Sequence, residues 1–242
     1  MKPQVLNTLP LSFQNYLMEV SAPPKRLYVY GENIELLEKL PNFGLAVVGT
    51  RKPNLNLKKM TYRWVSDLKT TSLIVISGLA KGIDFNAHLA ACEAHIPTIA
   101  VLGSGFNIYL SDEQNQLKQK ILKSGGLILT EYSADHPPQK FQFLKRNRLI
   151  AGLSRAVLVV HAPKRSGSMN TARWAIEMNK DLYTVPCTPG QPSCEGNQEL
   201  LDSGQAYPFW GVHNLGATWL DLASLPSNGG NKVFSEKFST QF

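Results

Sequence analysis

The feature that most constrains the fold is a series of short apolar runs without polar alternation. Such runs occupy residues 45–49, 73–77, 98–103, 127–132, 156–162 and 182–186. Helical patterns fill most of the intervals, as in the stretch DFNAHLAACEAH that follows residues 73–77. A strand without alternation is buried on both faces, which is typical of a parallel sheet covered by helices. The sequence therefore predicts an α/β fold with a doubly wound, mostly parallel sheet and helices on both of its faces.

The alternating pattern also predicts how the chain is divided. Residues 43–213 carry the strands and helices and are predicted to form one domain. Residues 1–42 are predicted to be a lead-in segment, with a break at the stretch SAPPK. Residues 214–242 include PSNGGNK and are predicted to be a short, loose C-terminal tail.

Basic residues are concentrated in two parts of the chain. The net charge is +7, yet residues 39–66 and 136–176 hold 14 of the 25 lysines and arginines and no acidic residue. The other segments hold the remaining 11 basic and all 18 acidic residues, so they sum to −7. Segregated basic charge predicts a face that binds a polyanion, whereas a solvated surface without a partner is the alternative.

The composition also bears on location and redox state. We expect no transmembrane helix, because no apolar run reaches about 18 residues. The first residues lack the pattern of a signal peptide. The three cysteines, Cys92, Cys187 and Cys194, include no C-x-x-C pair, so we predict reduced thiols in a cytoplasmic protein.

Small and cationic residues follow four of the predicted strands. In a parallel α/β sheet, ligands bind beyond the carboxyl ends of the strands, where glycines and helix N-termini receive anions. The loops GTRKP, SGLAKGID, GSGFN and APKRSGSMNTA therefore predict an anion site, although a glycine at a strand end is often only a turn residue. The candidate residues are Gly49, Thr50, Arg51, Lys52, Ser77, Gly78, Lys81, Gly82, Gly103, Gly105, Ser166, Gly167 and Ser168. Ser166 or Ser168 is alternatively the N-cap of the next helix.

A second group of candidates lies in the stretch QKFQFLKRNRLIAGLS. Cations neutralise phosphates and aromatic rings stack on unpaired bases, so this mixture is typical of a site for single strands. The candidates are Lys140, Phe141, Phe143, Lys145, Arg146, Asn147 and Arg148. Burial of Phe141 in the core and a structural role for Asn147 are the alternatives.

Common cofactor and catalytic motifs are absent from the sequence. The loop VVGTRKPN has one glycine where a dinucleotide fingerprint needs three, and no Walker A or G-x-S-x-G pattern occurs. His88 lies four residues after Asp84, but no third metal ligand with suitable spacing is visible, so we predict a structural role for this histidine. Nothing in the sequence brings Glu131 and Glu177 together as an acid–base pair, and Cys187 has no evident base. We predict no cofactor, no metal and no catalytic residue.

Taken together, the loops resemble the DNA-processing protein A family (DprA, also called Smf). The resemblance covers about residues 24–213 and rests on VVGTRKP, SGLAKGIDFNAH, RNRLIAGLS, SGSMNTARWA and NQELLDSGQA, in this order. It implies an extended Rossmann fold that binds single-stranded DNA during bacterial natural transformation. It also implies protection of the incoming strand, loading of the recombinase RecA, and a homodimer that does not insert into a membrane.

The resemblance assigns roles to matching residues. Arg51 and Lys140 would contact phosphates, and Phe143 would shape a base pocket or stack in it. Many family members also carry an N-terminal helical domain and a C-terminal winged-helix domain, for which this chain has too little sequence. Cys187 stands where the family usually has a glycine.

Two other functions stay open at this stage. A nucleotide-hydrolysing enzyme would need a PGG-x-GT-x-x-E loop, but SGSMNTARWAIE lacks the double glycine and has Glu177 too far along. A nucleotide-sensing module without a DNA role is the other alternative, which nucleotide binding without DNA binding would favour.

Overall fold

A computed structural model of the 242-residue chain describes residues 4–5, 8–187 and 192–215. In these residues, nine strands form one sheet in the order β1-β2-β6-β5-β4-β3-β7-β8-β9. The strands are β1 (Gln4–Val5), β2 (Tyr28–Tyr30), β3 (Gly44–Val48), β4 (Ile74–Ser77), β5 (Thr98–Leu102), β6 (Leu127–Thr130), β7 (Ala156–Val159), β8 (Asp181–Thr184) and β9 (Tyr207–Pro208). The pairings from β6 to β9 are parallel, and β1 and β2 are antiparallel additions beside β6. The predicted mostly parallel sheet is confirmed.

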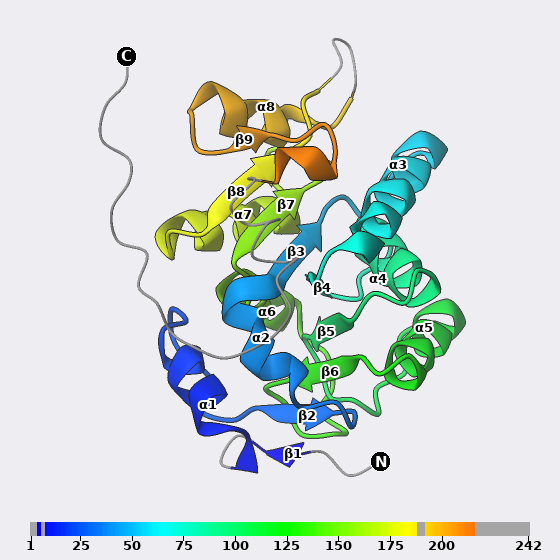
Figure 1. The fold of residues 1–242 in the computed structure, drawn as a ribbon, viewed down its shortest axis with the longest axis vertical. Coiled ribbons are helices and arrows are strands. Elements are labelled where there is room, and N and C mark those ends of the chain that lie inside the picture. Colours follow the sequence, from blue (N-terminus) through cyan, green and yellow to red (C-terminus); the bar gives the residue numbers. More distant parts are fainter. Residues whose placement is uncertain (1–3, 6–7, 188–191, 216–242) are drawn as a thin grey trace.

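Helices cover both faces of the sheet, as predicted. They are α1 (Leu11–Met18), α2 (Leu36–Phe43), α3 (Leu55–Ser66), α4 (Ile83–Glu93), α5 (Asp112–Lys123), α6 (Lys140–Gly152), α7 (Gly167–Glu177) and α8 (Glu195–Asp202). One core cluster packs α1, α2, α6, α7 and α8 against the sheet, and two clusters pack α3, α4 and α5 against its other face. Figure 1 shows α3, α4 and α5 together along one side of the strands.

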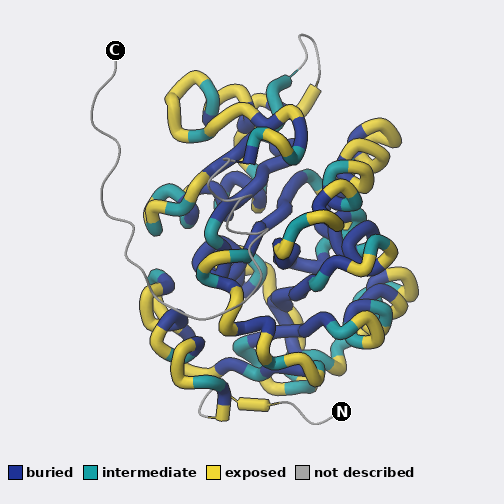
Figure 2. The backbone as a smooth tube through the Cα atoms, in the orientation of Figure 1, coloured by how far each residue is buried: buried dark blue, intermediate teal, exposed yellow. Residues whose placement is uncertain are grey.

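Burial follows this layered arrangement. Every residue of β3, β4, β5, β6 and β7 is buried, which explains why the sequence of these strands shows no alternation. In Figure 2 the central strands are dark blue, whereas the outer turns of α3 are yellow. The four predicted loops follow β3, β4, β5 and β7, and they lie at one edge of the sheet because these strands are parallel.

Two helix ends follow the predicted signals. The Ser111 side chain accepts a hydrogen bond from the backbone N–H of Gln114 at the start of α5, and Gly125 follows this helix with a φ of +80°. The predicted short helix over RNRLIAGLS is longer than expected, because α6 begins at Lys140. The backbone N–H of Gln139 donates to the Gln142 side chain at 2.9 Å, which stabilises this earlier start.

The lead-in segment contributes α1, β2 and α2, and β2 pairs with β6 in the main sheet. Most of the predicted tail, residues 216–242, lies outside the described residues. Within the described part of the chain, no helix is long and apolar enough to span a membrane.

Candidate nucleic-acid interface

A cavity of about 760 Å³ opens at the carboxyl ends of β3, β4 and β7, where the predicted loops meet the first turns of α6. Eleven sequence candidates line it: Gly49, Thr50, Arg51, Lys52, Lys140, Phe143, Arg146, Asn147, Ser166, Gly167 and Ser168. Apolar side chains such as Val48, Leu57 and Ile150 complete its lining. A cavity with an apolar lining and cations beside it can hold a planar base and its phosphate.

Backbone hydrogen bonds hold the three loops against one another. The Thr50 N–H donates to the His161 carbonyl at 2.7 Å, and the Ile83 N–H donates to the Thr50 carbonyl at 3.2 Å. Gly82 makes this approach possible. Its φ is +91°, and a Cβ there would lie 2.3 Å from the Thr50 carbonyl oxygen. The loop GTR is therefore fixed from both sides.

Three cations at the cavity have no acidic partner among the described residues. Arg51 and Lys52 come from the loop after β3, and Lys140 comes from the first turn of α6; all three side chains are exposed. The Arg51 guanidinium lies over the Phe143 ring, 5.9 Å from its centroid. An anion that enters the cavity meets these three cations, none of which forms an ion pair within the described part of the chain.

Phe143 occupies its place because the residue facing it is a glycine. A Cβ on Gly103 would lie 2.8 Å from the Phe143 ring. Gly103 is thus needed for the position of the aromatic ring, and it does not itself line the cavity. Gly105 also supports backbone packing, since a Cβ there would lie 2.2 Å from the Ala134 carbonyl oxygen.

The start of α7 carries a helix cap and also borders the cavity. Ser166 is the N-cap, and its hydroxyl accepts from the Met169 N–H at 3.3 Å. The alternative of N-capping is therefore confirmed for Ser166. Ser166, Gly167 and Ser168 still line the cavity, so the N-terminus of α7 faces it.

Arg146 has a structural role that its sequence position did not reveal. Its side chain is 4% exposed, and Nη1 donates to the carbonyls of Gly78, at 2.9 Å, and Val101. Burial lowers the pKa of Arg146 to about 10. Asp84 is buried beside it, and burial raises the pKa of this carboxyl although Arg146 opposes the shift. Arg146 lines the cavity as part of its wall, with its Nε and Nη1 donors engaged by protein acceptors.

Arg148 lies away from the cavity and pairs with Glu131. Its Nη2 is 2.6 Å from a Glu131 carboxylate oxygen, with the two side chains 3% and 10% exposed. Its Nε donates to the Ala22 carbonyl at 2.9 Å. Arg148 thus lies outside the cavity lining, where its guanidinium joins the lead-in segment to α6.

Other candidates also lie outside the cavity lining. Ser77 is fully buried and donates to the Val47 carbonyl at 2.6 Å, and the Gly78 N–H donates to Asp84. Lys81, Phe141 and Lys145 are exposed beyond the lining. The predicted core burial of Phe141, offered as an alternative, is wrong, since this ring is 59% exposed.

The side-chain amide of Asn147 has the structural role that the sequence analysis gave as an alternative to DNA contact. Its Nδ2 donates to the Gly167 carbonyl at 3.0 Å and to Asn170, so it joins α6 to the start of α7.

His88 also has its predicted structural role: it is fully buried, and its Nδ1 lies 2.8 Å from the Thr98 hydroxyl. No group of three metal-ligating side chains occurs in the part of the chain that the structure describes.

The cysteine prediction is wrong for one pair. Cys187 and Cys194 are joined in a disulfide across a loop at the end of β8, whereas Cys92 is a buried free thiol. Pro192 and Ser193, next to Cys194, line the cavity together with His161. Sequence reasoning missed this wall, because the C-x₆-C spacing is not a common motif.

Comparisons with known proteins show which family and fold this chain is similar to. Residues 6–218 match the family model for DNA recombination-mediator protein A. Protein Smf from Synechocystis is 37% identical over 84% of this chain and 50% of its own length. DNA processing protein DprA from Bacillus subtilis is 33% identical over 88% of this chain and 71% of its own. The chain thus spans about half the length of the first of these relatives.

A solved structure shares the fold over nearly the whole chain. It is that of DNA processing protein A from Helicobacter pylori, described for that protein's single-stranded DNA binding mode. The identity is 31%, the TM-score is 0.77, and the match covers 92% of this chain and 100% of the other.

Proposed function

The chain belongs to the DNA recombination-mediator protein A family, and from this premise we propose that it binds single-stranded DNA in the cavity between α6, α7 and the β3–α3 loop. One observation carries the proposal: the exposed cations Arg51, Lys52 and Lys140 lie around an apolar cavity beside the Phe143 ring. The Helicobacter pylori relative, whose fold matches, supports the same class of ligand.

In this arrangement, each group has a distinct task. Arg51, Lys52 and Lys140 contact phosphates, and the N-terminus of α7 supplies backbone donors to another phosphate oxygen. Phe143 stacks on an unpaired base, which a duplex would keep within its own stack. Preference for the single strand follows from this requirement for an unstacked base.

A role without catalysis fits the same cavity. Among the described lining residues, Asp84 is the only carboxylate, and its Oδ2 accepts from the Gly78 N–H at 3.1 Å. Glu131 pairs with Arg148, and Glu177 accepts from the Ser21 hydroxyl at 3.0 Å, so neither faces the cavity as an acid or base. We therefore assign binding, rather than nucleotide hydrolysis, to this site.

The wider role follows from the family resemblance. The bound strand is incoming DNA in natural transformation, protected in the cytoplasm and passed to the recombinase RecA by a homodimer of this chain. Light scattering of the purified chain tests the homodimer. A RecA strand-exchange assay with and without the chain tests loading.

The binding proposal is tested by fluorescence anisotropy. A labelled oligonucleotide is titrated with the chain as a single strand and as a duplex, each at two salt concentrations. Tight binding that prefers the single strand and weakens with salt is expected, because phosphate contacts release counterions. Absence of binding at low salt contradicts the proposal and favours a nucleotide ligand, which calorimetry with mononucleotides would detect.

A further inference from the structure

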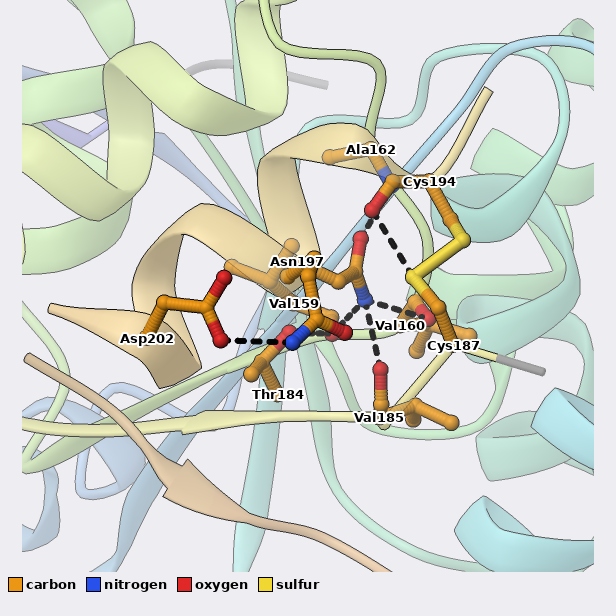
Figure 3. Close-up of a disulfide and its surroundings, with 10 residues drawn as sticks. Val159, Val160, Ala162, Thr184, Val185, Cys187, Cys194, Asn197 and Asp202 are labelled. Carbon is orange, nitrogen blue, oxygen red and sulfur yellow. Dashed lines mark hydrogen bonds between the residues drawn. A yellow bond between two sulfur atoms is a disulfide. The ribbon is translucent and has the colours of Figure 1, made fainter. Parts of the chain in front are cut away.

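The disulfide between Cys187 and Cys194 lies at the wall of the proposed DNA cavity. Figure 3 shows the two sulfur atoms joined above the ends of β7 and β8, next to Asn197. Cys194 is 4% exposed and immediately precedes α8 as its N-cap, whereas Cys187 is partly exposed. Cys187 is therefore the more exposed residue of the pair, and Cys194 is the covered one.

The residues next to Cys194 form part of the cavity. Pro192 and Ser193 line it together with His161. Ser193 has a φ of +61°, a left-handed conformation that costs a non-glycine residue energy unless its surroundings hold it. The covalent bond at Cys194 constrains Ser193, the residue that precedes it, so the disulfide helps to hold this wall.

The hydrogen bonds that hold α8 to the sheet beside the disulfide do not depend on the disulfide. The Asn197 Nδ2 donates to the carbonyls of Val160, at 3.1 Å, and Val185, at 3.0 Å, while its Oδ1 accepts from the Ala162 N–H at 2.7 Å. This one buried side chain fastens α8 to the ends of β7 and β8. Loss of the disulfide would therefore release the wall without separating α8 from the sheet.

We propose that Cys187 and Cys194 form a site of reversible thiol oxidation, whose disulfide state holds Pro192 and Ser193 in place and so strengthens binding in the cavity. The effect on DNA rests on the function proposed above. A wall that is already ordered need not be ordered when the ligand binds, which raises affinity. The thiol state keeps the cavity but loses this preorganisation.

The chemistry is exchange with a low-molecular-weight disulfide such as oxidised glutathione. The Cys187 thiolate attacks one sulfur of the oxidant, forms a mixed disulfide and releases one glutathione thiolate. The Cys194 thiolate then attacks the Cys187 sulfur, which forms the Cys187–Cys194 bond and releases the second glutathione. Two protein thiols are oxidised, one glutathione disulfide is reduced to two thiols, and the two protons from the cysteines end on them or in solvent.

Reduction follows the reverse course. A reducing thiolate attacks the sulfur of Cys187, the more exposed residue of the pair, and Cys194 leaves as a thiolate at the N-terminus of α8, where the helix dipole favours negative charge. A second reducing thiolate then attacks the mixed disulfide and releases the Cys187 thiolate. The Cys187 sulfur lies 2.8 Å from the Cys194 carbonyl oxygen, which gives the reduced Cys187 thiol an acceptor already in place.

The test compares the full chain after treatment with oxidised glutathione and after treatment with dithiothreitol. Thiols counted in denaturant should fall from three to one, since Cys92 remains free. The oxidised chain should bind a labelled single strand about fivefold more tightly. Cys187→Ser should bind like the reduced chain under both treatments, while the control Cys92→Ser should respond like the parent chain.

Several results would overturn the proposal: three thiols that persist after oxidation, equal affinities in the two states, weaker binding by the oxidised chain, or a Cys187→Ser variant that still responds. Hydrogen exchange separates this failure from a failure of the DNA proposal. If neither state binds DNA, slower amide exchange over Ser193–Asn197 in the oxidised chain still supports control of the wall, and equal exchange refutes it.

Discussion

The guanidinium of Arg146 lies directly against Gly78, at the point where β4 turns into its loop. Arg146 Nη1 donates to the Gly78 carbonyl at 2.9 Å, and a Cβ on residue 78 would lie 2.5 Å from Nη2. Arg146 can be buried here only because residue 78 has no side chain. The buried Arg146 in turn forms part of the cavity wall.

Replacing Gly78 with alanine should displace Arg146. We expect Gly78→Ala to lower the free energy of unfolding by about 1–3 kcal/mol, the usual cost of overpacking. Gly167→Ala is the matched control, because its Cβ would meet only the Asn147 Nδ2, at 3.9 Å. Urea denaturation of both variants measures the difference. Equal midpoints for Gly78→Ala and the parent chain would contradict the packing described here.

Phe143 should contribute to binding of bases and little to the salt dependence. We expect Phe143→Ala to weaken single-strand binding about tenfold, because a stacked base is worth ~1–3 kcal/mol. The salt slope should stay unchanged, since no phosphate contact is lost. Phe141→Ala is the control, as this ring lies outside the cavity lining two residues earlier in α6. Equal losses in the two variants, measured by anisotropy, would remove Phe143 from the site.

The ion pair of Arg148 and Glu131 should matter for stability and not for DNA. Glu131→Gln leaves the buried guanidinium without its counter-charge, so we expect the free energy of unfolding to fall by ~3 kcal/mol. Affinity for the single strand should stay within twofold of the parent chain when measured well below the melting temperature. An affinity loss as large as that of a cavity variant would return Arg148 to the DNA contacts.

The stability of the chain should depend on pH through His88. Burial, assisted by the Arg146 charge, lowers the pKa of His88 to about 3 from an unfolded value near 6.5. Between these values the unfolded state binds the extra proton, so the free energy of unfolding falls as pH falls, by at most ~1.4 kcal/mol per unit. The raised pKa of Asp84 acts in the opposite direction in the acidic range. Urea denaturation from pH 6.5 to 5 should give a shallower decline for His88→Gln; parallel declines would contradict the buried neutral imidazole.

Sequence reasoning reached the sheet and the loops because their signals are local. The fully buried β3 and β7 read as apolar runs, and the loops at their carboxyl ends follow from parallel topology. Sequence reasoning did not distinguish the cations of α6 that line the cavity from those that pair with other residues. Lys140 faces the cavity and Arg148 faces Glu131, and the direction of each depends on neighbours far along the chain.

The same limit explains why the roles of two glycines and the pairing of two cysteines were not predicted. Gly103 and Gly105 belong to a glycine-rich loop, but their role is to admit Phe143 and the Ala134 carbonyl, which sequence spacing does not reveal. Cys187 and Cys194 are seven positions apart in the sequence, and the fold joins them in a disulfide between β8 and α8. Contacts set by tertiary packing were the ones that sequence patterns missed.

The most direct test of the DNA-binding cavity is the salt dependence of a double variant. Arg51→Ala combined with Lys140→Ala removes two exposed cations at the cavity, and Lys69→Ala combined with Lys123→Ala removes two exposed cations elsewhere. Single-strand affinity is measured by anisotropy across a range of salt concentrations. We predict that the cavity variant loses about 1.4 units of slope in log K against log salt, since each phosphate contact on a single strand contributes ~0.7, while the control keeps the parent slope. Identical slopes for the two double variants would contradict binding of DNA in this cavity.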